Sequence, residues 1–401
     1  MRIFLSAGEA SGEHYAVQLI EAIRRRIPDA HFFGLGGQRM QALGFDRIVR
    51  AEDVAVMGIT EILRHIPRIY REYRRLKRSL ATHRPQVAVL IDFPDVNLGL
   101  ARACRRLQIP VIFFVSPQVW AWKKYRLRAI RRNVDHMLVI FPFEEAFYRE
   151  RGIQATFIGH PLAQLAPPTL SRQDFADRHG LDPSRPWVGL LPGSRPREIA
   201  LNLPTMLSAA ALTLESNGDA PSPHFLLPLA PTLTSEQVAG VQAILASDPS
   251  AARLAAQVTL VSDARATLHH AAASVVASGT ATIEAALSGN PFLVVYRVSP
   301  LTYAIARRVV TVPHVAMVNL VAGRRLVPEL IQHDFTAPNV AATLHTLLND
   351  QSARQTITAG LAEVRALLTA TGTGAIERLA TATLAAARAP LPASDAAMPH
   401  S

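Results

Sequence analysis

A Ser-Gly-Thr corner at residues 278–280 stands between an apolar run and a helix-favouring segment. The run 273–277 predicts a buried strand, and the segment after the corner predicts a helix. The first N–H groups of a helix have no partner within it, so such a corner can bind a phosphate. Glu284, one turn further on, would repel a phosphate but could accept hydrogen bonds from a ribose. The pattern therefore fits a nucleotide sugar, and it also fits an ordinary turn capped by Thr280 or Thr282.

A second corner of similar chemistry follows the apolar run 187–191. Residues 192–195 are Pro-Gly-Ser-Arg, and Glu198 lies in the segment after them. Ser194 can donate to a phosphate, and Arg195 can offer it two parallel hydrogen bonds. Neither corner has the Gly-Lys-Ser/Thr ending of a P-loop or the Gly-x-Gly-x-x-Gly pattern of dinucleotide binding. Because both corners fall in one predicted domain, each strengthens the interpretation of the other as an anion-binding site.

Carboxylates follow the apolar runs of the amino-terminal part. Asp92 ends the run 86–92, Asp95 comes directly after it, and Glu9 lies on the loop after the first run. A carboxylate at the end of a buried strand can act as a general base toward a hydroxyl, because partial burial raises its pKa. Asp95 also fits the N-cap of a helix, and each acid taken alone fits a purely structural role.

Other side chains near the predicted strand ends have less specific chemistry. His160, Trp120 and Trp122 could line an acceptor site, and the tryptophans could equally anchor a core or an interface. No spacing of His, Cys, Asp and Glu indicates a metal site. The single cysteine, Cys104, has no evident catalytic partner and fits both a reducing compartment and a core position.

Short apolar runs alternate with helix-compatible segments along the chain. In the first part the runs lie at 3–7, 31–37, 86–92, 109–116, 136–141 and 155–159. In the second part they lie at 187–191, 224–229, 257–261, 273–277 and 292–296. This alternation indicates an α/β fold with parallel sheets covered on both faces. Ligands bind beyond the carboxyl ends of such strands, so one shared edge is expected for the loops at Gly8, Gly36, Asp92, Ser116 and Gly159.

A chain of 401 residues is longer than a typical domain with a single core, so its length predicts two domains. We expect one Rossmann-like domain at residues 1–165 and a second at 166–365, facing each other across a cleft. The Ala- and Pro-containing passage 163–169 is the expected linker. Residues 366–401 are expected to form a helix that returns to the first domain, followed from about residue 384 by a disordered tail.

The net charge of +11 lies in the first part of the chain. Residues 1–160 hold 26 Lys and Arg against 15 Asp and Glu, whereas residues 161–401 hold 16 of each. A basic surface attracts a polyanion, and both nucleic acid and an anionic membrane face qualify. A basic face that is merely solvated is the plainer alternative.

Segment 57–80 combines this charge with one apolar stripe. The apolar positions recur every three or four residues, at Ile62, Ile66, Ile69, Tyr73, Leu76 and Leu80. Such a helix can lie on an anionic membrane, or it can pack its apolar face on the sheet. Pro67 predicts a break or a helix start within the segment. Because no apolar run is long enough to span a bilayer and no amino-terminal signal is visible, a cytoplasmic protein is expected.

Together these motifs resemble those of the lipid-A-disaccharide synthases, glycosyltransferases of the two-domain GT-B type. The matching segments follow in order along nearly the whole chain, at 8–12, 92–97, 116–122, 159–162, 191–195 with Glu198, 278–284, 296–297, 319–323 and 329–332. The chain departs from the family pattern at Glu13, where an aspartate is usual, and at Gln118, where a serine is usual. Met317 and Val318 replace a Leu-Pro pair. These departures affect the residues that are expected to contact the acceptor.

The resemblance implies transfer of 2,3-diacylglucosamine from UDP to the 6-hydroxyl of 2,3-diacylglucosamine 1-phosphate, with inversion of the anomeric centre and release of UDP. It implies no metal and no cofactor. The general base would be Asp92 or Asp95, with Glu9 the weaker candidate. The expected substrate-binding residues are Ser194, Arg195, Glu198, Ser278, Gly279, Thr280, Thr282, Glu284, Arg297, Asn319, Gln332 and His160.

Acylated sugars reside in a membrane leaflet, so segment 57–80 is the expected contact with the cytoplasmic face of the inner membrane. The nearest alternatives are another UDP-N-acetylglucosamine transferase, such as the peptidoglycan type, and a UDP-N-acetylglucosamine 2-epimerase. A nucleic-acid-binding protein is the remote alternative, and the low aromatic content of 6% speaks against it. The oligomeric state is not indicated.

Overall fold

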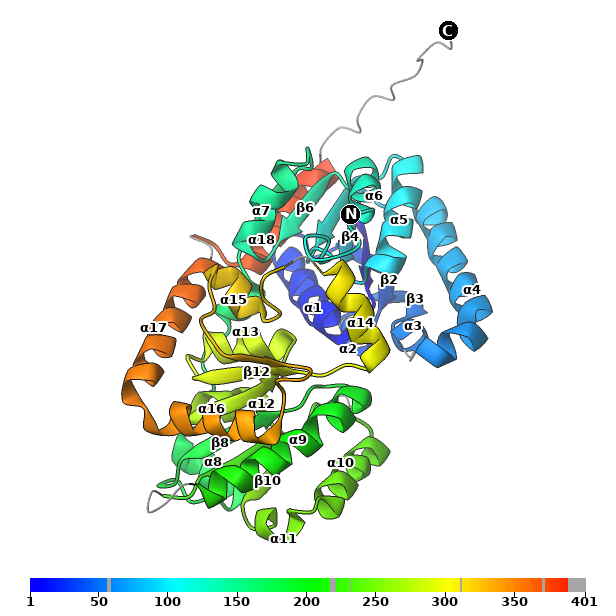
Figure 1. Ribbon diagram of the computed structural model, residues 1–401. Coiled ribbons are helices and arrows are strands. Elements are labelled where there is room, and N and C mark those ends of the chain that lie inside the picture. The colour runs from blue at the N-terminus through cyan, green and yellow to red at the C-terminus, as the bar shows by residue number, and fades with distance from the viewer. Residues whose placement is uncertain (56–58, 217–220, 232, 311, 370–371, 389–401) are drawn as a thin grey trace. The chain divides into compact units, whose positions relative to one another are not determined.

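The fold is described from a computed structural model (Figure 1). The structure describes all residues except 56–58, 217–220, 232, 311, 370–371 and 389–401. The side chains of residues 10, 54–66, 251–252, 301, 305–306 and 309 also lie outside the description. The chain divides into two compact units. Unit 1 comprises residues 1–164 and 368–401, and unit 2 comprises residues 165–367.

Unit 1 is built on a seven-stranded parallel sheet. Its strands are β1 (Arg2–Ala7), β2 (His31–Gly36), β3 (Asp46–Arg50), β4 (Val87–Ile91), β5 (Val111–Phe114), β6 (His136–Val139) and β7 (Ala155–Phe157), in the order β3-β2-β1-β4-β5-β6-β7. Every pair of neighbours is parallel. The carboxyl ends of these strands therefore share one edge, as the sequence predicts.

Strand β3 is the one strand of this sheet that the apolar pattern does not predict. Its sequence is Asp-Arg-Ile-Val-Arg, and of its residues only Val49 is fully buried. The strand lies at the edge of the sheet, beside β2. An edge strand needs few apolar residues, so it gives a weak sequence signal.

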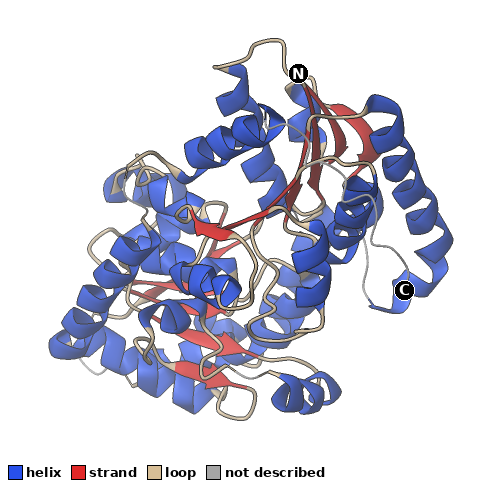
Figure 2. Cartoon of the chain, turned by 90° about the horizontal axis from the view of Figure 1, so that it is seen from above, coloured by secondary structure: helices blue, strands red, loops and turns tan. Residues whose placement is uncertain are grey.

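Helices flank the strands (Figure 2). In unit 1 they are α1 (Ala10–Arg24), α2 (Gln38–Ala42), α3 (Glu52–Ala55), α4 (Ile59–His83), α5 (Pro94–Arg106), α6 (Arg126–Asn133), α7 (Pro142–Arg149), the 3-10 turn η1 (Pro161–Gln164) and α18 (Ala375–Arg388). Helix α1 begins at Ala10, so the loop that carries Gly8 and Glu9 is short. The Glu13 N–H already donates to the Glu9 carbonyl at 2.9 Å, which begins the helical hydrogen bonding.

Helix α4 continues through Pro67, so the predicted break or helix start at this residue is wrong. A proline inside a helix removes one hydrogen bond. The loss is offset by packing further along the helix, where Leu76 and Leu80 are buried in the unit 1 core. Ile62 and Ile66 of the predicted apolar stripe lie outside the described side chains.

Helix α18 packs beside α1 in unit 1 (Figure 1). The guanidinium groups of Arg25 and Arg26 each lie 2.5 Å from the Glu377 carboxylate, while Leu379 and Leu384 are buried. The helix continues to Arg388, past the residue where the tail was expected to begin. The remainder of the predicted tail, 389–401, lies outside the described residues.

Unit 2 is built on a six-stranded parallel sheet. Its strands are β8 (Trp187–Leu191), β9 (His224–Pro228), β10 (Val258–Val261), β11 (Ala273–Ala277), β12 (Phe292–Tyr296) and β13 (Glu329–Ile331), in the order β10-β9-β8-β11-β12-β13. Five of these strands are predicted by their apolar runs. The sixth, β13, has three residues and again lies at an edge of its sheet.

The helices of this part of the chain follow the same βα alternation. They are α8 (Arg172–His179), α9 (Pro196–Glu215), α10 (Ser235–Ser247), α11 (Ala251–Leu254), α12 (Ala264–His270), α13 (Thr280–Leu287), α14 (Pro300–Val309), α15 (Met317–Ala322), α16 (Ala337–Asn349) and α17 (Gln351–Leu368). Across the described residues, no helix of either unit is both long and apolar enough to cross a membrane.

Candidate active site

The loop that joins β4 to α5 places Asp92 at the carboxyl edge of the unit 1 sheet. Asp92 and Phe93 both have a φ of 48°, a left-handed conformation that non-glycine residues seldom adopt. Pro94 then begins α5 with a backbone angle suited to a first helical turn. Gly8 makes room for this turn, because a Cβ at Gly8 would lie 2.4 Å from the Phe93 ring.

Asn97 anchors the same loop from beneath. Its side chain is fully buried, and its Nδ2 donates to the carbonyl of Asp92 at 2.7 Å and to that of Ile91 at 3.2 Å. The hydroxyl of Ser6, on β1, donates to Asn97 Oδ1 at 2.6 Å. Asn97 therefore ties the two central strands to the turn that carries Asp92. Asn97 belongs to the motif 92–97, but only the structure shows that it anchors the loop.

Replacing Asn97 with alanine should destabilise the fold and displace Asp92. Each buried polar group left without its partner costs about 1–3 kcal/mol, so we expect the free energy of unfolding to fall by roughly this amount. Urea denaturation measures the loss. Asn349→Ala, at an exposed site at the end of α16, is the matched control. Equal denaturation midpoints for the Asn97 variant and the control would contradict the anchoring role.

The three predicted carboxylates have different surroundings. Burial, and secondly the charge of Glu9, raises the pKa of Asp92 to about 6. Asp95 has a side chain that is 73% exposed and forms an ion pair with Arg126. Glu9 occupies the N-cap position of α1 without a side-chain cap. Asp92 is partly buried, and its pKa is close to that of an efficient base.

His160, Trp120 and Trp122 follow two of the other strands. His160 is buried, its Nδ1 accepts from the Leu162 N–H at 3.2 Å, and burial lowers its pKa to about 4. Trp120 is also buried and donates to Glu144 at 3.0 Å, whereas Trp122 is 42% exposed. His160 and Trp120 therefore hold loops in place, and Trp122 is the one of the three that is open to solvent.

Glu144 is a buried acid outside the motifs predicted from the sequence. Burial raises its pKa to about 7, although the Trp120 indole and the Phe141 N–H both donate to it. Ser116 and Tyr148 lie 2.6 Å apart in the same network. These contacts fasten the 116–122 loop to α7. The sequence alone does not predict these contacts, because it does not distinguish a buried glutamate from one on the surface.

Two corners meet at the carboxyl edge of the unit 2 sheet. Strands β8 and β11 are parallel neighbours, with Leu191 opposite Val276. The loops that follow them, 192–195 and 278–280, therefore leave the sheet side by side. The sequence predicts both corners, and the sheet order brings them together.

The 192–195 corner is held by Glu198. Its carboxylate accepts from the Ser194 N–H at 3.3 Å and from Arg195 at 3.4 Å. Gly193 has a φ of 123°, and a Cβ there would lie 2.6 Å from the same carboxylate, so only glycine fits. Ser194 and Arg195 are exposed. Their polar side chains are accessible to an anion.

The 278–280 corner begins α13. Gly279 and Thr280 are exposed, whereas Thr282 is fully buried and its hydroxyl donates to the Gly279 carbonyl at 2.7 Å. Thr282 therefore closes the first turn of the helix. Burial raises the pKa of Glu284. The exposed start of α13 has the geometry of an anion site, and Thr282 supports it from inside.

The remaining predicted ligands of unit 2 are engaged with backbone. Arg297 donates to the Thr205 hydroxyl at 2.7 Å and to the Phe335 carbonyl. Asn319 is fully buried and accepts from the Leu326 and Val327 N–H groups at 2.8 and 2.9 Å. Gln332 pairs with both backbone groups of Val298, at 3.2 and 3.0 Å. These three side chains fix the loops after β12 and before and after β13.

Within the described ranges, no group of three or more His, Cys, Asp and Glu side chains is arranged to hold a metal ion. Glu13, the departure in the first loop, caps α2 instead. Its Oε1 accepts from the Arg39 N–H at 2.8 Å, and a Cβ on Gly37 would lie 2.3 Å from the same atom. Glu13 therefore has a structural role in this chain.

The site residues of both units fall within one family match. A model of the family described as lipid-A-disaccharide synthetase matches residues 3–381. The chain belongs to the lipid-A-disaccharide synthase family. It is similar to the lipid-A-disaccharide synthase of Acidobacterium capsulatum, with 62% identity over 382 residues and 94% of each chain covered. The enzyme of the same name from Koribacter versatilis is 47% identical over 391 residues, which cover 97% of this chain and 99% of that one.

Solved structures share the fold of this family member at low sequence identity. The UDP-GlcNAc 2-epimerase of Neisseria meningitidis aligns with a TM-score of 0.60 at 12% identity, covering 96% of this chain and 100% of that one. MurG of Acinetobacter baumannii aligns with a TM-score of 0.55 at 14% identity, covering 96% and 99%. The predicted family, GT-B fold and glycosyltransferase function in lipid A synthesis are confirmed.

Proposed function

We propose that the chain joins UDP-2,3-diacylglucosamine to 2,3-diacylglucosamine 1-phosphate, forming the disaccharide 1-phosphate and UDP. The observation that carries this proposal is the family match along residues 3–381. The raised pKa of Asp92 supports a base in unit 1, and the two exposed corners after β8 and β11 support binding of the diphosphate in unit 2. A UDP-release assay tests it, because release should require both sugars. Equal release from the donor alone would contradict the transfer.

In the proposed reaction, Asp92 accepts the proton of the acceptor 6-hydroxyl. The oxygen attacks the anomeric carbon as the bond from that carbon to the diphosphate breaks, and UDP leaves with the electron pair. A single displacement of this kind inverts the anomeric centre. Arg195 and the N–H groups at the start of α13 stabilise the negative charge that develops on the diphosphate. Glu284 accepts hydrogen bonds from the ribose.

The rate should depend on pH through Asp92. A general base works only in its deprotonated form, and burial together with Glu9 raises the pKa of Asp92 to about 6. Activity is therefore expected to fall as the pH drops through 6 and to reach a plateau above it. A pH profile of kcat/KM measures this. A constant rate on both sides of pH 6, with the fold intact by circular dichroism, would contradict the assignment.

We further propose that segment 57–80 contacts the anionic cytoplasmic face of the inner membrane. In its described part, Arg68, Arg74 and Arg78 are exposed, and Tyr70 is 60% exposed. Exposed basic residues beside an exposed aromatic ring suit a lipid headgroup region. The proposed membrane contact is inferred from the charge and the exposure of these residues.

Serine at Ile62, Ile66 and Ile69 should release the protein from membranes with its fold intact. In this proposal the three isoleucines supply the insertion energy, whereas the neighbouring arginines supply only a salt-sensitive attraction. Co-sedimentation with phosphatidylglycerol vesicles measures the partition. Leu367→Ser, at a 46% exposed site on α17, is the control. Unchanged partition of the triple variant would contradict this contact.

A further inference from the structure

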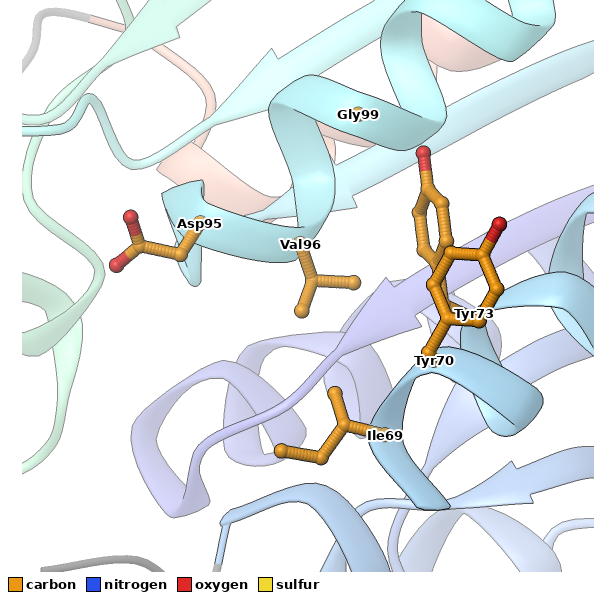
Figure 3. Close-up of a pocket in the computed structure, with 6 residues that line it drawn as sticks. All are labelled: Ile69, Tyr70, Tyr73, Asp95, Val96 and Gly99. Carbon is orange, nitrogen blue, oxygen red and sulfur yellow. The ribbon is translucent and has the colours of Figure 1, made fainter. Parts of the chain in front are cut away.

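Unit 1 has a groove between α4 and α5, directly beside the Asp92 loop (Figure 3). Its volume is about 280 Å³. The lining residues are Ile69, Tyr70 and Tyr73 from α4 and Asp95, Val96 and Gly99 from α5. In Figure 3, Val96 and Ile69 extend toward each other from the two helices, and the carboxylate of Asp95 points away from Val96. The two tyrosines stand at the opposite end from Asp95.

Gly99 and Tyr73 define the tyrosine end of the groove. A Cβ on Gly99 would lie 2.5 Å from the Tyr73 hydroxyl oxygen, so the glycine makes room for this ring. Tyr73 also packs against the unit 1 core, and burial raises the pKa of its hydroxyl, which keeps the group neutral. The walls are therefore uncharged along the groove, and the only carboxylate, Asp95, stands at one end beside Arg126.

We propose that this groove binds one acyl chain of the acceptor lipid, with Tyr73 setting the length of chain that fits. The inference rests on the proposed function, which supplies a diacylated acceptor. Asp95 and Val96 open α5, in the same turn region that presents Asp92. A sugar whose hydroxyl meets Asp92 thus has the Asp95 end of the groove next to it. An alkyl chain attached to that sugar gains from burial between Val96 and Ile69.

A free peptide strand suits the groove poorly. Its lining is dominated by apolar and aromatic side chains. A peptide backbone would bring polar groups that such walls leave unpaired, and unpaired buried polar groups are costly. An alkyl chain has no such groups. The groove chemistry therefore selects the acyl part of the lipid.

Gly99→Ala tests the proposal through chain-length selectivity. The added Cβ meets the Tyr73 hydroxyl oxygen, so the ring must move. Because Tyr73 also packs against the unit 1 core, we expect it to move into the groove. We expect the ratio of kcat/KM for a myristoylated acceptor to that for a butyrylated acceptor to fall on the order of tenfold. Tyr73→Phe removes the clashing oxygen, so the Gly99→Ala, Tyr73→Phe double variant should recover most of the ratio.

Gly240→Ala is the matched control, because a Cβ at Gly240, within α10, meets no atom within 4 Å. It should leave the ratio at the wild-type value. An equal loss on both acceptors, or a change that follows the chain length of the donor, would overturn the groove assignment. Wild-type protein that forms no disaccharide with either acceptor would overturn the proposed function instead. Direct binding of the two acceptors to each variant, measured by calorimetry, should change in the same ratio.

Discussion

Replacing Asp92 with asparagine should lower kcat by about 100- to 10,000-fold, the range typical for loss of a general base. Asparagine keeps the shape of the side chain and cannot take the proton of the acceptor hydroxyl. The loop should remain in place, because Asn97 holds the backbone carbonyl of residue 92 and makes no contact that depends on the carboxylate. Single-turnover rates with both acylated sugars, at saturating donor, measure the effect.

Asp95→Asn is the matched comparison. Asp95 is 73% exposed and paired with Arg126, so its carboxylate lacks the burial that raises the pKa of Asp92. Its substitution should change kcat far less than the Asp92 substitution. Full activity of Asp92→Asn, with a large loss in Asp95→Asn, would move the base to Asp95. Full activity in both variants would remove the 92–97 loop from the base role.

Replacing Arg195 with alanine should lower kcat/KM by about 100- to 1,000-fold, as for the loss of a group that stabilises developing charge. Arg195 is exposed at the N-cap of α9, in the loop after β8. Strand β8 lies beside β11, the strand that leads to the 278–280 corner. Charge grows on the diphosphate as the glycosidic bond breaks, so the loss should be larger in kcat than in donor affinity. Steady-state kinetics with varied donor separate the two.

Arg197→Ala is the control for Arg195. Arg197 is also exposed, lies two residues further along, and carries the same charge. If general positive charge were sufficient, both substitutions would reduce the rate alike. Arg195→Lys should recover only part of the activity, because lysine lacks the planar pair of donors that suits a phosphate. Wild-type kinetics for Arg195→Ala would remove this corner from the leaving-group role.

The fold follows from the sequence wherever strands are buried on both faces. The runs 187–191, 273–277 and 292–296 coincide with β8, β11 and β12, because a central parallel strand must be apolar at nearly every position. The apolar pattern does not predict the edge strands β3 and β13, because most of their residues are only partly buried. Continuation of α4 through Pro67 was also not predicted, since tertiary packing outweighs the local preference of proline.

The sequence shows which residue types could carry the chemistry of the site. It does not show which of them face a ligand and which support the fold. Asp92, Arg195 and the 278–280 corner are predicted by residue type and position after apolar runs. Asn319 and Thr282 carry polar groups that suit a nucleotide equally well, yet the structure turns both inward onto backbone groups. Sequence pattern reports which groups are present. Only the folded chain shows which of these polar groups already have hydrogen-bond partners within the protein.

The most direct test of the account is to incubate the purified protein with UDP-2,3-diacylglucosamine and 2,3-diacylglucosamine 1-phosphate and to identify the product by mass spectrometry and NMR. We expect a tetraacylated disaccharide 1-phosphate, linked to the 6-hydroxyl with inverted anomeric configuration, and one UDP released for each disaccharide formed. A donor that is epimerised, or hydrolysed without joining the acceptor, would contradict it.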